Sequence, residues 1–207
     1  MEAEKKDARY TYTDYASWDD GNRRELINGV PFMMSPAPSP VHQRILGNLH
    51  LQIATYLRGK TCEAFLAPFD VRLNADAEDD TVVQPDLSIV CEPSKIDERG
   101  CKGAPDMVVE ILSPTTRKHD TSVKLKKYLE AGVREYWIVD QEERTLFVYM
   151  LENGKYTLQA YEDTQSVPVG IFEDCIIDLA EIFPAAEIAP SSDVEQEIPD
   201  TSPETAE

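Results

Sequence analysis

The stretch Val108-Val109-Glu110-Ile111-Leu112-Ser113-Pro114 places one acidic residue inside an apolar run. The run predicts a buried strand over residues 107–112, ended by the Ser-Pro pair. Side chains alternate between the two faces of a strand, so Glu110 shares its face with Val108 and Leu112. A carboxylate has no reason to lie in a buried strand unless it is paired with a cation or holds a metal.

A second carboxylate, Asp86, follows a proline and opens another apolar run. Lys124 lies on a helix that we predict over residues 120–131, directly after the strand of Glu110, and a helix packed back on that strand can return Lys124 to Glu110. Two strand carboxylates and a lysine are typical of a metal-dependent phosphodiesterase, in which the carboxylates hold Mg²⁺ or Mn²⁺ and the cation steadies the attacking water. A buried ion pair of Glu110 with Lys124, with Asp86 only opening a turn, explains the spacing equally well.

The elements around this stretch indicate the fold class. Asn28-Gly29 stands between two apolar runs and predicts a hairpin, because both turn positions need positive φ. Apolar residues recur every four positions from Val41 to Leu57 and predict a long helix. Strands follow, then the helix of Lys124, then a strand hairpin. This order predicts an α+β or mixed α/β protein with one central mixed sheet flanked by helices.

The chain is acidic throughout its 207 residues, with a formal net charge of -19. Seven of these charges lie in residues 187–207, which contain no Lys or Arg, and removing them leaves -12. We expect a flexible N-terminus over 1–9, one domain over 10–184, and an acidic disordered tail over 185–207. An acidic body argues against non-specific binding of nucleic acid through a basic surface.

The cysteines bear on the cellular compartment. The four have no C-x-x-C spacing, and the charged N-terminus does not resemble a signal peptide, so we expect free thiols in a cytoplasmic protein. The sequence contains no run of about 18 apolar residues, so we predict no membrane span. The four are Cys62, Cys91, Cys101 and Cys175.

An ordered series of short motifs resembles the Uma2 family of restriction-endonuclease-like proteins, within the PD-(D/E)xK nuclease superfamily. The resemblance covers roughly residues 10–184. Each motif is weak alone, but the ordered set is specific. The motifs are Glu25-Leu26-Ile27-Asn28-Gly29, Ser35-Pro36-Ala37-Pro38-Ser39-Pro40-Val41-His42, Gln84-Pro85-Asp86-Leu87, Val109-Glu110-Ile111-Leu112-Ser113-Pro114-Thr115-Thr116, Asp120 with Lys124 and Tyr128, and Ala131-Gly132-Val133-Arg134-Glu135-Tyr136-Trp137-Ile138-Val139-Asp140.

The resemblance implies a sheet flanked by helices and a nuclease site that uses Mg²⁺ or Mn²⁺. Asp86 matches the Asp of the PD motif, and Glu110 matches the (D/E) position. The position of the motif's lysine falls on Leu112, which cannot do a lysine's work. A lysine on the following helix substitutes in the family pattern, and Lys124 matches that position.

Two further residues match family positions and are candidate site members. Glu25 stands at the foot of the Asn-Gly hairpin as a possible metal ligand or orienting group, although a salt bridge with Arg23 or Arg24 explains it equally well. His42 begins the long helix in a Ser-Pro-x-His context. Asp120 lies one helical turn before Lys124, where it suits a helix cap and a pair with that lysine.

The sequence therefore predicts a metal-dependent endonuclease that hydrolyses phosphodiester bonds of nucleic acid, with DNA the first candidate. The acidic body and the missing strand lysine favour an alternative, a catalytically inactive interaction module with the nuclease fold. A hydrolase of another substrate is the third reading. A homodimer is expected, because the hairpins after Tyr136 offer strand edges. The densest basic stretch would favour the enzyme if it were exposed near the site; it contains Arg117, Lys118, Lys124, Lys126 and Lys127.

Overall fold

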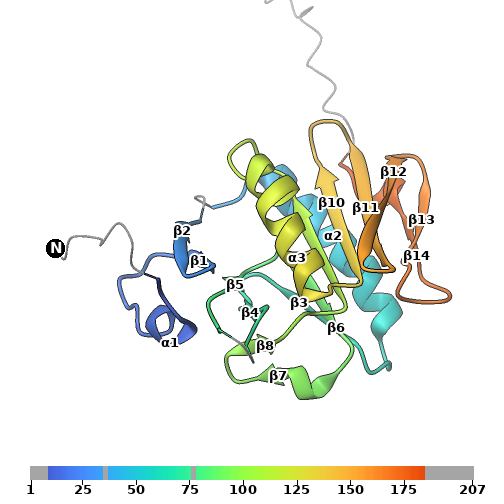
Figure 1. The fold of residues 1–207 in the computed structure, drawn as a ribbon. Coiled ribbons are helices and arrows are strands. Elements are labelled where there is room, and N and C mark those ends of the chain that lie inside the picture. The colour runs from blue at the N-terminus through green and yellow to red at the C-terminus, as the bar shows by residue number, and fades with distance from the viewer. Residues whose placement is uncertain (1–8, 35–36, 76–77, 185–207) are drawn as a thin grey trace, which may run out of the picture.

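The computed structural model describes residues 9–34, 37–75 and 78–184 (Figure 1). The acidic tail and nearly all of the expected flexible N-terminus lie outside the described residues, and the division into one domain with two flexible ends stays a prediction. Within the described residues, no helix is long and apolar enough to cross a membrane.

The fold is mixed α/β, as predicted, but it contains two six-stranded mixed sheets where the sequence indicated one. The sheet with the longer strands, called the larger sheet from here on, has the order β12 (Lys155–Glu162), β11 (Thr145–Glu152), β10 (Glu135–Asp140), β9 (Met107–Ile111), β6 (Leu87–Val90) and β3 (Glu63–Leu66). The smaller sheet has the order β2 (Val30–Met33), β1 (Arg24–Ile27), β5 (Val82–Val83), β4 (Val71–Arg72), β8 (Gly100–Lys102) and β7 (Ile96–Asp97).

One long helix, several short helices and turns, and one further hairpin make up the other described elements. They are α1 (Tyr12–Tyr15), α2 (Pro40–Leu57), a 3₁₀ turn (Pro93–Lys95), a π-helix (His119–Lys124), α3 (Leu125–Ala131), the hairpin β13 (Ser166–Pro168) with β14 (Ile176–Asp178), and a closing 3₁₀ turn (Leu179–Glu181). In Figure 1, α2 and α3 lie on opposite sides of the larger sheet.

Helix α2 forms for the reasons that the sequence gives. The Ser39 hydroxyl accepts a hydrogen bond from the backbone N–H of His42, and Pro40 occupies the first turn, where a missing N–H costs nothing. The buried stripe of Ile45, Leu49 and Ile53 packs on one face of the larger sheet. This packing fixes the start of α2, and with it His42, above the end of the sheet.

Strand β9 alternates as predicted. Val109 and Ile111 belong to the core under α2, whereas Val108 and Leu112 belong to the core under α3. Glu110 is the acidic residue of the second face, and its side chain is 5% exposed. Gly132 ends α3 with a φ of 83°, a left-handed conformation in which glycine carries no steric cost.

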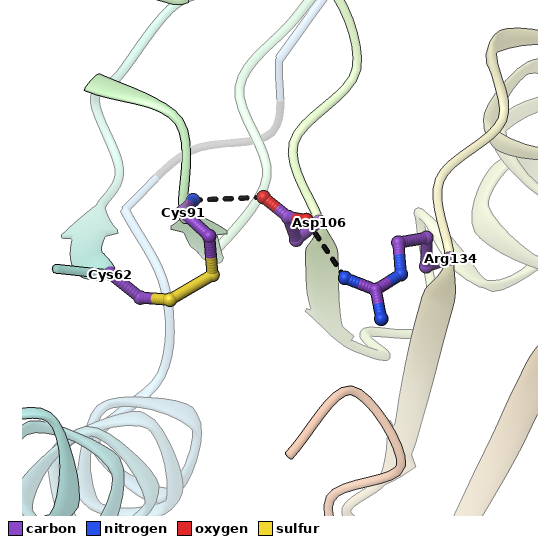
Figure 2. The surroundings of a disulfide bond; sticks show 4 residues. All are labelled: Cys62, Cys91, Asp106 and Arg134. Atoms are coloured by element: carbon purple, nitrogen blue, oxygen red, sulfur yellow. Dashed lines mark hydrogen bonds and ion pairs between the residues drawn. A yellow bond between two sulfur atoms is a disulfide. The ribbon is translucent and has the colours of Figure 1, made fainter. Parts of the chain in front are cut away.

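The expectation of four free thiols is wrong for one pair, because Cys62 and Cys91 form a disulfide (Figure 2). Cys62 precedes β3 and Cys91 follows β6, and these strands pair antiparallel with Glu63 opposite Val90. The register of the sheet therefore brings the two sulfur atoms together. Cys101 and Cys175 are free and buried.

Candidate functional site

Lys124 reaches Glu110, as predicted, from the last turn of the π-helix. Its Nζ lies 2.8 Å from Oε1 of Glu110, and the hydroxyl of Tyr128 donates a hydrogen bond to the same oxygen at 2.7 Å. The Lys124 side chain is 6% exposed. The contact needs a helix that returns across its own strand, and the turn over Ser113–Thr116 supplies that return, because the N–H groups of Thr116 and Arg117 donate to the carbonyl of Ser113.

Two more carboxylates surround the same ammonium group. Oε1 of Glu25, on β1, lies 2.8 Å from Nζ of Lys124, and Oδ1 of Asp120 lies 3.6 Å from it. The alternative explanation of Glu25, a salt bridge with Arg23 or Arg24, is not found among the described contacts, in which Arg24 pairs with Asp20 and Arg23 bonds Gln84. Asp120 pairs with Lys124 as expected, but it lies inside the π-helix and does not cap it.

One buried lysine thus faces three buried carboxylates, whose pKa values shift in different directions. Burial raises the pKa of Glu110 well above its usual value, and the charges of Asp120, Asp86 and Glu25 raise it further against the opposing effect of Lys124. Burial also raises the pKa of Asp120. Burial opposes ionisation of Glu25 too, yet Lys124 and the backbone N–H of Gln84 lower its pKa to about 2.

The lysine itself stays charged. Burial alone would lower the pKa of Lys124, but Glu110, Glu25 and Asp120 together raise it well above the usual value. The cluster therefore holds a fixed positive charge and a surplus of carboxylates. A surplus of buried negative charge is costly unless protons or a further cation balance it.

Asp86 stands next to this cluster at the start of β6. Its Oδ2 accepts a hydrogen bond from the backbone N–H of Ile111 at 2.8 Å, and Nε2 of His42 lies 3.1 Å from the same oxygen. The Asp86 side chain is 21% exposed, so water reaches it. Asp86 therefore contacts Ile111, the residue that follows Glu110 on β9, and His42 holds the Asp86 carboxylate in this orientation.

The two carboxylates predicted to hold a metal have suitable chemistry for one. In each of these two carboxylates the contacts described above involve a single oxygen, Oδ2 in Asp86 and Oε1 in Glu110. Carboxylate oxygens are hard ligands and suit Mg²⁺ and Mn²⁺. No three His, Cys, Asp or Glu side chains converge as a cage within residues 9–34, 37–75 and 78–184. Mg²⁺ does not need one, since it keeps several waters and binds through one or two carboxylates.

Three further side chains lie at the site, of which Tyr128 belongs to a family motif, whereas His119 and Phe32 carried no sequence signal of a role there. His119 begins the π-helix, and its Nε2 lies 3.6 Å from Oε2 of Glu25. The ring of Phe32 lies 5.0 Å from the His119 ring. Tyr128 is fully buried beneath Glu110. A π-helix shifts the helical register, so spacing alone did not indicate which side chains face the cluster.

Most of the predicted basic stretch is paired with acids, and Lys118 is exposed with no ion pair among the described contacts. Arg117 pairs with Asp140 and Glu142, and Lys124 is buried in the cluster. Lys126 and Lys127 both pair with Glu130. A second Pro-Asp pair in the sequence, Pro105-Asp106, lies outside the cluster, and the carboxylate of Asp106 accepts hydrogen bonds from the N–H of Cys91 and from Arg134 (Figure 2).

The mixed α/β architecture with two mixed sheets places the chain in a known structural class. It matches the crystal structure of a "putative nuclease belonging to DUF820" from Anabaena variabilis with a TM-score of 0.66 and 22% sequence identity, over 84% of this chain and 97% of that one. At this identity the match establishes the fold.

The chain belongs to the Uma2 family, described as "Putative restriction endonuclease", whose model matches residues 12–180. The resemblance seen in the sequence is therefore confirmed. An uncharacterised protein of Synechocystis sp., slr1290, is 23% identical over 153 residues, which cover 72% of this chain and 78% of that protein.

Proposed function

We propose that this protein is a metal-dependent nuclease that hydrolyses phosphodiester bonds of nucleic acid, with DNA the first substrate to test. The observation that carries the proposal is the position of Nζ of Lys124, 2.8 Å from both Glu110 and Glu25. Leu112 occupies the position at which the nuclease motif has a lysine, and Lys124 on the π-helix would take over the role of that lysine. Family membership supports the reaction class.

The chain's own residues divide the work. Asp86 and Glu110 would hold Mg²⁺ or Mn²⁺, which supplies an activated water and neutralises phosphate charge when bound. Lys124 donates from Nζ toward negative charge at the site, while Glu25 fixes its position. His42 orients Asp86 through Oδ2, and Tyr128 fixes Oε1 of Glu110.

The test is cleavage of single-stranded and duplex DNA and RNA with Mg²⁺ or Mn²⁺, by wild type, Glu110→Gln, Asp86→Asn and Lys124→Met. Removing a group that acts on the transition state should lower the rate by about 10²-fold or more. Asp106→Asn is the matched control, because Asp106 is a half-buried carboxylate outside the cluster. Undiminished cleavage by Glu110→Gln would refute the mechanism.

A catalytically inactive module with the nuclease fold is favoured by one observation, the pairing of the basic stretch with acids. Titration calorimetry of Mg²⁺ and Mn²⁺ separates the two functions. Binding by wild type that is lost in Glu110→Gln supports the nuclease. The absence of binding at millimolar metal in both proteins supports the inactive module. Metal binding without cleavage of nucleic acid would indicate a hydrolase of another substrate.

The expected homodimer remains a prediction. Strand β12 lies at one end of the larger sheet, and Leu158 on it is 53% exposed. An eight-residue edge strand can pair with a second copy. Light scattering of wild type and of Ala160→Pro tests the prediction, because the register of β12 on β11 turns the N–H of Ala160 toward the open edge.

A further inference from the structure

An exposed aromatic side chain adjoins the candidate site. Phe32 is 38% exposed and lies on β2 directly opposite Glu25 of β1. Cross-strand partners project to the same face of a sheet, so Phe32 stands on the face from which Glu25 reaches Lys124. Its ring lies 5.0 Å from the ring of His119, at an angle of 47°. Phe32 and His119 together form an aromatic wall beside the carboxylate–lysine cluster.

Pairing of β2 with a strand of another chain is a poor explanation for the exposure of Phe32. Strand β2 is at the end of its sheet, and its second residue is Pro31. Proline has no backbone N–H, so it blunts an edge against a further strand. An exposed Phe at such an edge is therefore free to contact a ligand through its ring.

The charge of the protein limits how a nucleic acid can bind here. The chain carries a net charge of -19, and Arg117, Lys126 and Lys127 are paired with acids. Phosphate contacts by Lys and Arg are the usual source of nucleic-acid affinity. In the basic stretch beside the site, Lys118 is the exposed cation without an ion pair among the described contacts, so the stretch offers few such contacts. Binding at the site needs a contribution that does not depend on positive charge, and stacking of bases on aromatic rings is one.

We propose that Phe32, supported by His119, is a nucleobase-stacking subsite, and that the substrate has an unpaired nucleotide at the cleavage position. This inference rests on the proposed nuclease function and names its substrate class. Bases inside a duplex are stacked on one another and do not reach a side chain, whereas single strands, overhangs and loops present them. Stacking is tolerant of sequence, so the subsite selects strandedness and not sequence.

The experiment measures binding, so that it stands apart from the cleavage assay. Fluorescence anisotropy follows a labelled short oligothymidylate, and the same strand with abasic positions, with Ca²⁺ in place of the catalytic metal. The proteins are wild type, Phe32→Ala, Phe32→Trp and the control Leu158→Ala, which removes an exposed apolar side chain from a different sheet. Thermal melting confirms that each variant is folded.

We expect Phe32→Ala to weaken binding of oligothymidylate by about 5- to 150-fold, the range measured for loss of one base–aromatic stack. Phe32→Trp and Leu158→Ala should bind like wild type, and wild type should bind the abasic strand as weakly as Phe32→Ala binds the normal one. Equal binding by Phe32→Ala and wild type, or no binding by wild type, overturns the subsite. Cleavage that persists in Glu110→Gln while Phe32→Ala weakens binding refutes the proposed mechanism and leaves the subsite standing.

Discussion

Replacing Lys124 by methionine removes the one cation of the cluster and keeps most of its side-chain volume. The Lys124 side chain is 6% exposed, and its Nζ lies 2.8 Å from both Glu110 and Glu25. Breaking a buried pair from one side costs about 3–5 kcal/mol, since it leaves a buried charge uncompensated. For a chain of this size that loss corresponds to about 6–20 °C in Tm. Lys124→Met should therefore melt far below wild type at neutral pH.

The assay is thermal melting of wild type, Lys124→Met and Lys126→Met from pH 7 down to pH 5. Lys126 lies two residues away and its side chain is 74% exposed, so its replacement should change Tm by little. Burial raises the folded-state pKa of Glu110 well above the unfolded value of 4.5 even beside Lys124, and removing that positive charge should raise it further. The cost of ionising buried Glu110 grows as the pH rises above 4.5 and shrinks as the pH falls toward it, so the deficit of Lys124→Met should narrow at pH 5.

The stability of the wild-type protein should decrease, and not recover, as the pH falls below 4.5. Glu25 has a folded-state pKa of about 2 against 4.5 when unfolded, so its contribution is present above pH 4.5 and is lost as the pH falls toward 2. The double variant Glu110→Gln, Lys124→Met should lose less stability than the sum of its single variants, because the two residues are in contact. The charge argument is refuted if Lys124→Met costs no more than Lys126→Met, or if its deficit does not change with pH.

The Cys62–Cys91 disulfide should contribute about 2–4 kcal/mol, so a reductant should lower Tm by about 4–16 °C. Thiol titration in denaturant should count two free thiols before reduction and four after, and four before reduction would contradict the pairing. Glu135→Ala removes the acceptor for Trp137 Nε1 and for two backbone N–H groups, which should cost at least about 3 kcal/mol in urea unfolding; a loss below about 1 kcal/mol would contradict this. Gly132→Ala forces a side chain into a φ of 83° and should cost about 1 kcal/mol by the same measurement, with Gly47→Ala in α2 as a control that costs nothing.

Local patterns were sufficient where the chain's own periodicity decides the structure. The alternation around Glu110 predicted the two faces of β9, and the Asn28-Gly29 turn predicted the first hairpin, in which both residues have positive φ. The apolar stripe of α2 and the stop at Gly132 also lie where the sequence indicated. These features depend on residues close in sequence, so local physical rules reach them.

Features that depend on distant segments were not predictable in the same way. Strands β4 and β5 have two residues each, too few to show a period, so the smaller sheet was not recognised. The disulfide depends on the register of β3 against β6, between cysteines 29 residues apart in sequence. The position of Glu25 at Lys124 likewise depends on how the smaller sheet packs against the π-helix.

The position of Lys124 shows why a lysine need not stay on the strand to serve the same cluster. Electrostatic interaction depends on the distance between charges and on burial, and the order of residues in the chain does not enter it. Leu112, directly after β9, packs in the core beneath α3, and the π-helix that follows brings Nζ of Lys124 to 2.8 Å from Glu110. A strand position without the lysine can join the core, while a helix that already packs on the strand carries the cation. The same helix also brings His119 against Phe32, so one element shapes both the cluster and the proposed stacking wall.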